Sequence, residues 1–262
     1  MVCEGPGFGG GEVEVPMTSV ETTIRDLADM PGAGVQTLLC GLDICLDPKV
    51  TNANGQVTIT APMPMMGEPP FTMVAPALKY GDGLLYGRFA IPLTEAVTVF
   101  PTVVTPKLPP LAEGTTLAAG MTVTSGDVTL TIPEGTEVEI DYLVYDEVEK
   151  EGFRTATIPD PSLLTAVDPT LGLEIAYAVA PVETLFCPAV MVTVPNTHGL
   201  TAGAEVEFFV HGVDVAQHWA PYAGWAKMSD GRVSADGMTI STSPEGGMSV
   251  LSVFGIRLKP EP

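Results

Sequence analysis

Hydrophobic and polar residues alternate with a period of two over much of this chain. In the clearest example, threonines separate Val128, Leu130 and Ile132. Successive side chains of a β-strand point to opposite faces of a sheet, so this period is typical of half-buried antiparallel strands. The same alternation occurs at 57–60, 137–141, 190–194, 206–210, 238–240 and 250–258. These runs predict a protein built from β-strands.

Short turn sequences separate the alternating runs. They are rich in Gly, Asn, Asp and Pro, the residues that favour tight turns. The turns are Asn54-Gly55, Gly81-Asp82-Gly83, Ser125-Gly126-Asp127, Pro133-Glu134-Gly135, Asp230-Gly231, Asp236-Gly237 and Glu245-Gly246-Gly247. The nearest approach to a helical period is at 19–30, but the β-branched residues Val20, Thr22 and Ile24 favour a strand there. We therefore expect an all-β fold.

The chain divides at a proline-rich stretch. Prolines 92, 101, 106, 109 and 110 fall close together, and such stretches act as semi-rigid extended spacers. We expect two antiparallel β-sandwich domains in tandem, at residues 17–100 and 112–262, joined by a linker at 101–111. Residues 1–16 are glycine-rich. We expect them to form a flexible tether, because no strand precedes the glycines as a dinucleotide-binding loop requires.

The first domain carries a recognisable order of strands and turns. Residues 20–26 read as a strand, Pro31-Gly32-Ala33-Gly34-Val35 as a turn into a second strand, and Thr51-Asn52-Ala53-Asn54-Gly55 as a turn before a third. This order resembles the carboxypeptidase regulatory-like and transthyretin-like β-sandwich domains, with Thr51-Asn52 in place of their usual Thr-Asp. Those domains are accessory modules, so the resemblance implies a fold and no catalytic activity.

A second resemblance covers residues 112–262. It rests on the strands and turns at 119–135, on the strand at 187–195 and on the turn at 199–206. These segments are similar to the ZU5-like β-sandwich domains of bacterial surface proteins. Residues 142–183 have no counterpart in that pattern. The resemblance implies a non-catalytic structural or interaction module.

Composition narrows the function classes. The chain has 32 acidic and 11 basic side chains, a net charge of −21. Nucleic acids and anionic membranes are bound through a basic face. The basic residues here are few and scattered singly, which excludes both partners. No uncharged run forms an apolar helix of about 20 residues, so we expect no transmembrane segment.

The four cysteines indicate a compartment. If Leu42 and Asp43 form a two-residue hairpin turn, Cys40 faces Cys45 with Cα atoms about 4.5 Å apart, within disulfide range. The alternative is a pair of buried free thiols. Cys3 and Cys187 are candidates for a long-range disulfide, and the alternative is a lipid anchor on Cys3. Disulfides and lipidated cysteines both occur outside the reducing cytosol.

The first residues lack the basic and apolar regions of a signal peptide. Whether a leader preceded Cys3 stays open. We expect a secreted or cell-surface protein, with a lipid anchor through Cys3 as one possibility.

One aromatic cluster is the best candidate for a binding site. Trp219, Tyr222 and Trp225 fall in a loop between two predicted strands. Their rings could stack on sugars. The alternative is an aromatic cluster that fills one end of the domain, which is the usual role of such residues.

Metal and catalytic sites have weaker support. A methionine cluster could bind Cu(I), histidines could bind a transition metal, and a row of carboxylates could bind Ca²⁺. These residues are Met63, Met65, Met66 and Met73; His198, His211 and His218; and Glu137, Glu139 and Asp141. The simpler interpretations are that the methionines belong to a loop that packs on the sandwich, and that the carboxylates form the solvated outer face of a sheet. The spacing of the histidines matches no common arrangement of metal ligands. Since no G-x-S-x-G motif occurs either, we expect no catalytic residue, no metal and no cofactor.

These patterns predict a non-catalytic protein that works in adhesion, scaffolding or envelope assembly. Its partner would be a protein or a glycan at the cell surface, and homo-oligomers are compatible with the same role. The alternative function is a carbohydrate-binding module that uses the loop of Trp219, Tyr222 and Trp225.

Overall fold

The structure is a computed structural model, and it confirms that the chain is all-β. It describes residues 3–9, 13–15, 19–40, 44–60, 64–67, 73–74, 91–92, 102–140, 151–164, 167, 169–214, 216–222 and 224–260. Apart from strands, these residues form only short 3₁₀ turns, η1 (Leu111–Glu113), η3 (Pro161–Leu163) and η4 (Pro169–Leu171). None of the described helices is long and apolar enough to cross a membrane.

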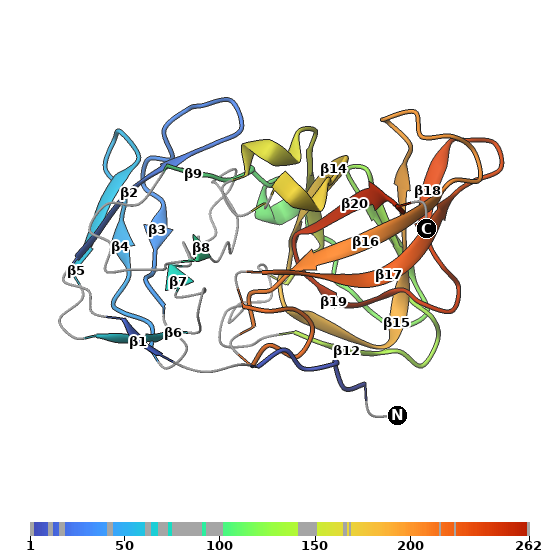
Figure 1. Cartoon of the computed structure of the whole chain (residues 1–262), viewed down its shortest axis with the longest axis horizontal. Coiled ribbons are helices and arrows are strands. Elements are labelled where there is room, and N and C mark those ends of the chain that lie inside the picture. The colour runs from blue at the N-terminus through green and yellow to red at the C-terminus, as the bar shows by residue number, and fades with distance from the viewer. Residues whose placement is uncertain are drawn as a thin grey trace.

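The N-terminal strands form several small sheets, which lie on the left in Figure 1. Strand β2 pairs with β5 in antiparallel fashion and with β9 in parallel, while β1 pairs with β6, β3 with β4, and β7 with β8. The strands are β1 (Val13–Val15), β2 (Ser19–Arg25), β3 (Gln36–Thr37), β4 (Lys49–Val50), β5 (Gln56–Thr60), β6 (Met65–Gly67), β7 (Met73–Val74), β8 (Ile91–Pro92) and β9 (Val103–Val104).

Strand β2 shows why the alternating pattern folds in this way. Val20 and Ile24 are buried and Glu21 is exposed, so the apolar residues face one side of the sheet. The turn before β5 needs Gly55, because its φ is +75° and a Cβ there would overlap the carbonyl oxygen of Ile24. Asn52 Oδ1 closes this turn by accepting hydrogen bonds from Asn54 N at 2.9 Å and from Gln56 N at 3.0 Å.

The C-terminal strands form one large antiparallel sheet with the order β10-β11-β15-β18-β17-β16-β20-β14-β13. Strands β12 and β19 pair with β15 beside this path. The strands are β10 (Thr122–Ser125), β11 (Val128–Thr131), β12 (Glu137–Glu139), β13 (Arg154–Ile158), β14 (Ile175–Ala180), β15 (Thr184–Pro195), β16 (Glu205–His211), β17 (Trp225–Val233), β18 (Thr239–Thr242), β19 (Met248–Leu251) and β20 (Phe254–Leu258).

The two ends of the large sheet meet, so that it is nearly closed. Thr155 N in β13 donates to Ser125 Oγ at 3.0 Å, and the Thr155 hydroxyl donates to the Ser125 carbonyl oxygen. The Thr157 hydroxyl donates to Asp127 Oδ2 at 2.6 Å. Contacts from the β10–β11 turn to β13 therefore stand in for the backbone hydrogen bonds that would join the two ends of the sheet in a closed barrel. Where the sequence predicts two sandwiches, the structure has this barrel-like sheet and the small N-terminal sheets.

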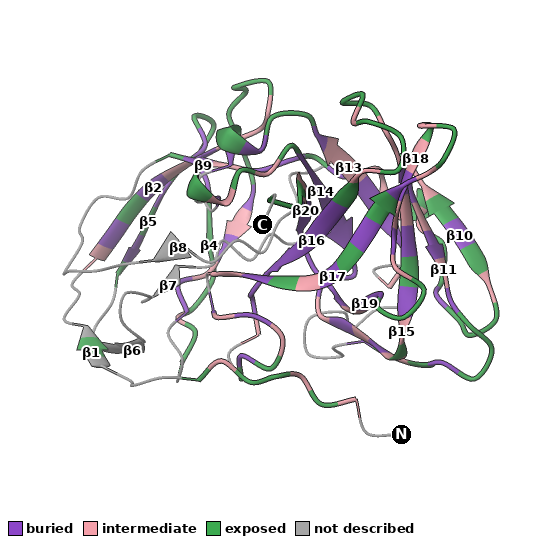
Figure 2. Cartoon of the chain, turned by 45° about the vertical axis from the view of Figure 1, so that its right-hand side comes forward, coloured by how far each residue is buried: buried purple, intermediate pink, exposed green. Residues whose placement is uncertain are grey.

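Aromatic rings fill the interior of the large sheet. The Phe254 ring in β20 stacks on Tyr177 in β14 and on Phe208 in β16, with centroid distances of 5.1 and 6.3 Å. All three side chains are fully buried. Figure 2 shows the strands that carry them as largely buried. The stack joins three neighbouring strands and marks the centre of the core.

Strand β14 is buried on both faces. Ile175, Tyr177 and Val179 face the interior, whereas Ala176 and Ala178 belong to a second apolar cluster outside the sheet. That cluster includes Leu108 from the predicted linker, and Leu27 from the N-terminal region packs against it. Small alanines suit this face, because the covering layer approaches the strand closely.

The segment predicted as a linker is part of the folded structure. Its start forms β9 beside β2, and Thr105 N donates to Arg25 O at 2.9 Å. Its end is fixed by Arg154 Nη1, which donates to Pro109 O at 3.1 Å. Residues 102–111 are thus attached to the N-terminal sheet at one end and to the large sheet at the other.

We predict that Tyr177→Phe stabilises the protein. The Tyr177 hydroxyl is buried and has no hydrogen-bond partner among the described residues. Leaving such a group unsatisfied costs about 1–3 kcal/mol, so its removal is expected to raise the free energy of unfolding by roughly 1 kcal/mol or more. Urea denaturation at pH 7 measures this, and a clear loss of stability would contradict it.

The same hydroxyl gives a pH dependence. Burial, and after it the charge of Asp127, raise the pKa of Tyr177 above its usual value of about 10. Above that pH the unfolded chain releases this proton and the folded protein retains it, so wild-type stability falls by up to about 1.4 kcal/mol per pH unit. Tyr177→Phe should lose stability less steeply than the wild type between pH 10 and 11, and equal slopes would argue against the assignment.

Candidate functional site

The N-terminal segment lies against the large sheet. We call residues 3–9 the strap. Gly7 N donates to His218 O at 3.1 Å, and Phe8 N donates to Gln217 O at 2.9 Å. Phe8 also packs against the main core. The sequence predicts a flexible tether at 1–16, whereas this part of it is held along its length.

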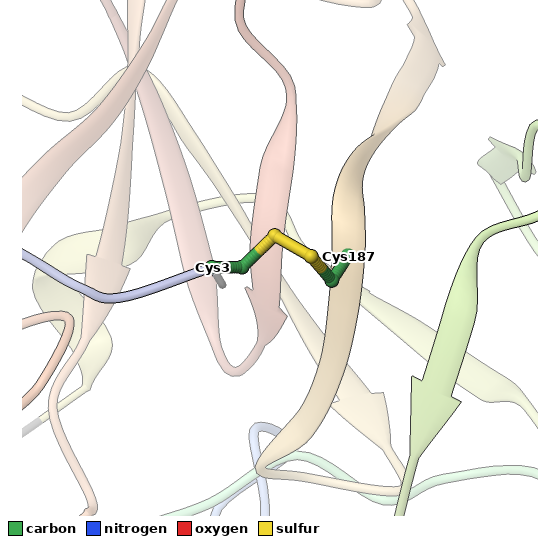
Figure 3. Close-up of a disulfide and its surroundings, with 2 residues drawn as sticks. All are labelled: Cys3 and Cys187. Carbon is green, nitrogen blue, oxygen red and sulfur yellow. A yellow bond between two sulfur atoms is a disulfide. The ribbon is translucent and has the colours of Figure 1, made fainter. Parts of the chain in front are cut away.

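A disulfide fixes the start of the strap. Cys3 pairs with Cys187 in β15, with Cα atoms 5.6 Å apart and a sequence separation of 184. Figure 3 shows the bridge, which joins the N-terminal segment to β15 near the beginning of that strand. A lipid anchor on Cys3 would need the same sulfur atom, so the structure favours the disulfide over that alternative.

The second predicted disulfide is also present. Cys40 and Cys45 form an isolated antiparallel bridge and a disulfide, with Cα atoms 4.0 Å apart. This is the cross-strand pairing expected from the hairpin, although residues 41–43 lie outside the described residues. No described cysteine is free. The two disulfides indicate a compartment outside the reducing cytosol.

Two adjoining hollows lie beside the strap, and both are bordered by Trp219, Glu139 and Leu185. The larger has a volume of about 240 Å³ and the smaller about 140 Å³. Together we call them the Trp219 groove. The remaining residues around them are Glu183, Asp214, His218 and Val250 for the larger hollow, and Cys3, Glu137, Phe186 and Cys187 for the smaller.

The loop that carries Trp219 is built by side-chain hydrogen bonds. Asp214 Oδ1 accepts from Ala216 N at 2.8 Å, and Asp214 Oδ2 lies 2.9 Å from His218 Nδ1. Buried Gln217 adopts a φ of +53°, and its Oε1 accepts from Tyr222 N at 3.0 Å. These bonds fix the loop on both sides of Trp219 and hold its ring at the groove.

The three predicted aromatic residues do not share one exposed surface. Trp219 is half-buried and borders the groove. Tyr222 is only 1% exposed, so its ring has no free face for a sugar. Trp225 meets the His211 ring edge-on at 5.2 Å and packs against the outer apolar cluster. Of the three, Trp219 is the one that the structure places at a hollow.

Ion pairs cover the outer face of β16, β17 and β20. Lys227 Nζ lies 3.0 Å from Glu207 Oε1 and 2.9 Å from Asp230 Oδ1, and Arg257 Nη2 lies 2.8 Å from Glu207 Oε2. Burial opposes ionisation of Glu207, but hydrogen bonds from Arg257 and Lys227 outweigh it and lower the pKa of this carboxyl. The basic residues that meet here are Lys227, Arg232, Arg257 and Lys259. They are clustered, which the sequence does not predict.

The candidate metal ligands are placed only in part. Glu137 and Glu139 are exposed on β12, while Asp141 and Met63 lie outside the described residues, as do the side chains of Met65, Met66 and Met73. His211 is buried, and His198 and His218 are exposed. Within the described ranges, no group of His, Cys, Asp and Glu could hold a metal ion.

We predict that Gly5→Ala displaces the strap. A Cβ at Gly5 would overlap the His218 carbonyl oxygen beside the Trp219 ring, whereas a Cβ at Gly9 would meet no atom within 4 Å. Forcing extra atoms into a close contact costs about 1–3 kcal/mol. Gly5→Ala should therefore lower the free energy of unfolding and speed proteolysis of the strap, and Gly9→Ala should do neither. Equal behaviour of the two variants would contradict the close approach.

No known family matches the chain, and no curated protein is similar to it.

Proposed function

We propose that this is a non-catalytic structural or interaction protein that is secreted or lies at a cell surface. The proposal rests on the contacts that hold the N-terminal segment and the linker against the large sheet. The Cys3–Cys187 disulfide fixes the strap on β15, and the linker is packed against the large sheet by Leu108 and Arg154. The N-terminal sheets are thereby attached at both ends. Such bracing suits a protein that must present a surface outside the cell.

The resemblances carried by the sequence support the same role. Transthyretin-like and ZU5-like domains are accessory or surface modules. Adhesion, scaffolding and envelope assembly each require a stable surface and no reacting group. The acidic excess, a net charge of −21, favours solubility and steers cationic partners toward the protein.

Labelling of intact producing cells tests the proposal. A membrane-impermeant, amine-reactive crosslinker should capture the protein from the outside, together with discrete heavier adducts. Non-reducing mass spectrometry of the same material should find no free thiol. A protein recovered only from the cytosol, with four free thiols, would overturn the proposal.

A second candidate is a carbohydrate-binding module. The observation that favours it is the position of Trp219, whose ring borders the groove beside the hydrogen-bond acceptors of Glu139 and Asp214. A glycan array tests it, because binding should disappear in Trp219→Ala.

A further inference from the structure

The walls of the Trp219 groove are acidic. Glu139, Glu183 and Asp214 line the larger hollow, and Glu137 lines the smaller. No Lys or Arg stands among the described residues that line either hollow. The clustered basic residues are engaged in ion pairs on the outer face of β16, β17 and β20. The groove therefore favours a positively charged occupant.

The groove also has an aromatic wall and an apolar lining. Trp219 borders both hollows, and an indole ring is the strongest aromatic partner of an ammonium or guanidinium group. Leu185 and Val250 line the larger hollow as well. A long basic side chain matches this combination, since its methylene stem packs on apolar surface while its charged end meets carboxylates.

The volume sets the size of the occupant. Each hollow of the groove, at about 240 and 140 Å³, is by itself smaller than the roughly 300–1,000 Å³ of sites that enclose a drug-sized ligand. It suits one side chain from a bound segment better than a whole small molecule. A stack of sugar rings would need a wider platform, and of the three predicted aromatic residues only Trp219 borders the groove, since Tyr222 is buried.

We propose that the Trp219 groove binds a Lys or Arg side chain in a basic segment of a partner protein. This inference rests on the proposed interaction function and names the chemistry of the partner. Glu139 binds the cationic end, Trp219 contacts it through its ring, and Leu185 packs along the stem. The strap forms part of the wall, because Cys3 borders the smaller hollow.

Calorimetric titration with a capped tetralysine peptide tests the proposal. The variants are Trp219→Leu, which removes the aromatic face, and Glu139→Gln, which removes one charge at the groove. Glu245→Gln is the matched control, since it changes the net charge equally at an exposed turn away from the groove. Capped tetraglutamine and chitotetraose are the uncharged ligands. Thermal unfolding confirms that each variant is folded.

We expect saturable binding of tetralysine that weakens as salt is raised. Glu139→Gln and Trp219→Leu should each reduce the affinity by about threefold to tenfold, with Glu245→Gln close to the wild type. Neither tetraglutamine nor chitotetraose should bind.

Three results would overturn the proposal. The first is no saturable binding of tetralysine. The second is an equal loss in Glu139→Gln and Glu245→Gln, which would mean diffuse attraction to an acidic protein. The third is binding of chitotetraose that depends on Trp219, which would favour the glycan module. The labelling of intact cells is independent of these results, so a surface-exposed protein with an inactive groove would keep the proposed function and lose only this inference.

Discussion

Removing the Cys3–Cys187 disulfide is expected to lower the free energy of unfolding by about 5 kcal/mol. The bridge closes a loop of 184 residues, and the entropy that a crosslink removes from the unfolded chain grows with the length of that loop. The Cys40–Cys45 bridge spans only 5 residues and should contribute about 2 kcal/mol by the same estimate. The long bridge is therefore the larger single determinant of stability.

Urea denaturation of two double variants measures the difference. One carries Cys3→Ser with Cys187→Ser, and the other carries Cys40→Ala with Cys45→Ala as a matched loss of one disulfide. If the long bridge contributes no more than the short one, the unfolded chain is already compact around Cys3 and Cys187, and the entropic explanation is wrong.

Truncating Phe254 to Ala is expected to cost about 3–5 kcal/mol, because it removes the ring from the centre of the core and leaves a cavity. Phe254 is fully buried between Tyr177 and Phe208, with its ring centroid 5.1 and 6.3 Å from theirs. The substitution should weaken the packing of β14, β16 and β20 against one another. Near-ultraviolet circular dichroism should weaken with the aromatic packing.

Phe254→Leu provides the control for this prediction. It keeps most of the apolar volume, so its cost should stay below that of Phe254→Ala, at about 1–2 kcal/mol. Urea denaturation monitored by tryptophan fluorescence gives the free energy of unfolding of both variants. A cost below about 1 kcal/mol for Phe254→Ala would place the centre of the core elsewhere.

Local patterns predicted many of the strands and the short disulfide, but not β13 or β14, and the turn predicted at Asp230-Gly231 lies inside β17. Val20 and Ile24 alternate with polar residues, and strands of this kind bury one face whatever the sheet becomes. Cys40 and Cys45 are close in sequence, so one hairpin decides their pairing. Both features depend only on residues that are close together in the sequence, so a single sequence is enough to predict them.

The near closure of the large sheet was not predicted. A strand in a barrel and a strand in a sandwich show the same alternation, because each has one buried face. The contacts that decide between them join Ser125 to Thr155 and Asp127 to Thr157, residues that are 30 positions apart. The ion pair between Lys227 in β17 and Glu207 in β16 depends on strand order in the same way.

The candidate site was predicted in part. The aromatic residues pointed to the loop that contains Trp219, but only packing shows that Tyr222 is buried and that Trp219 borders a groove. The glycines at 5–11 were interpreted as flexibility. Gly5 instead permits a close approach to His218, and a lack of side chain is compatible with either role.

The Cys3–Cys187 disulfide also determines how the protein would carry mechanical load. A pulling force applied at Cys3 and at β20 passes through the sulfur bridge directly into β15. The chain between the two cysteines, about 600 Å when fully extended, lies outside the load path. Tension would therefore not extend this part of the chain until the bridge is reduced, and a thiol reductant would make its full length available for extension.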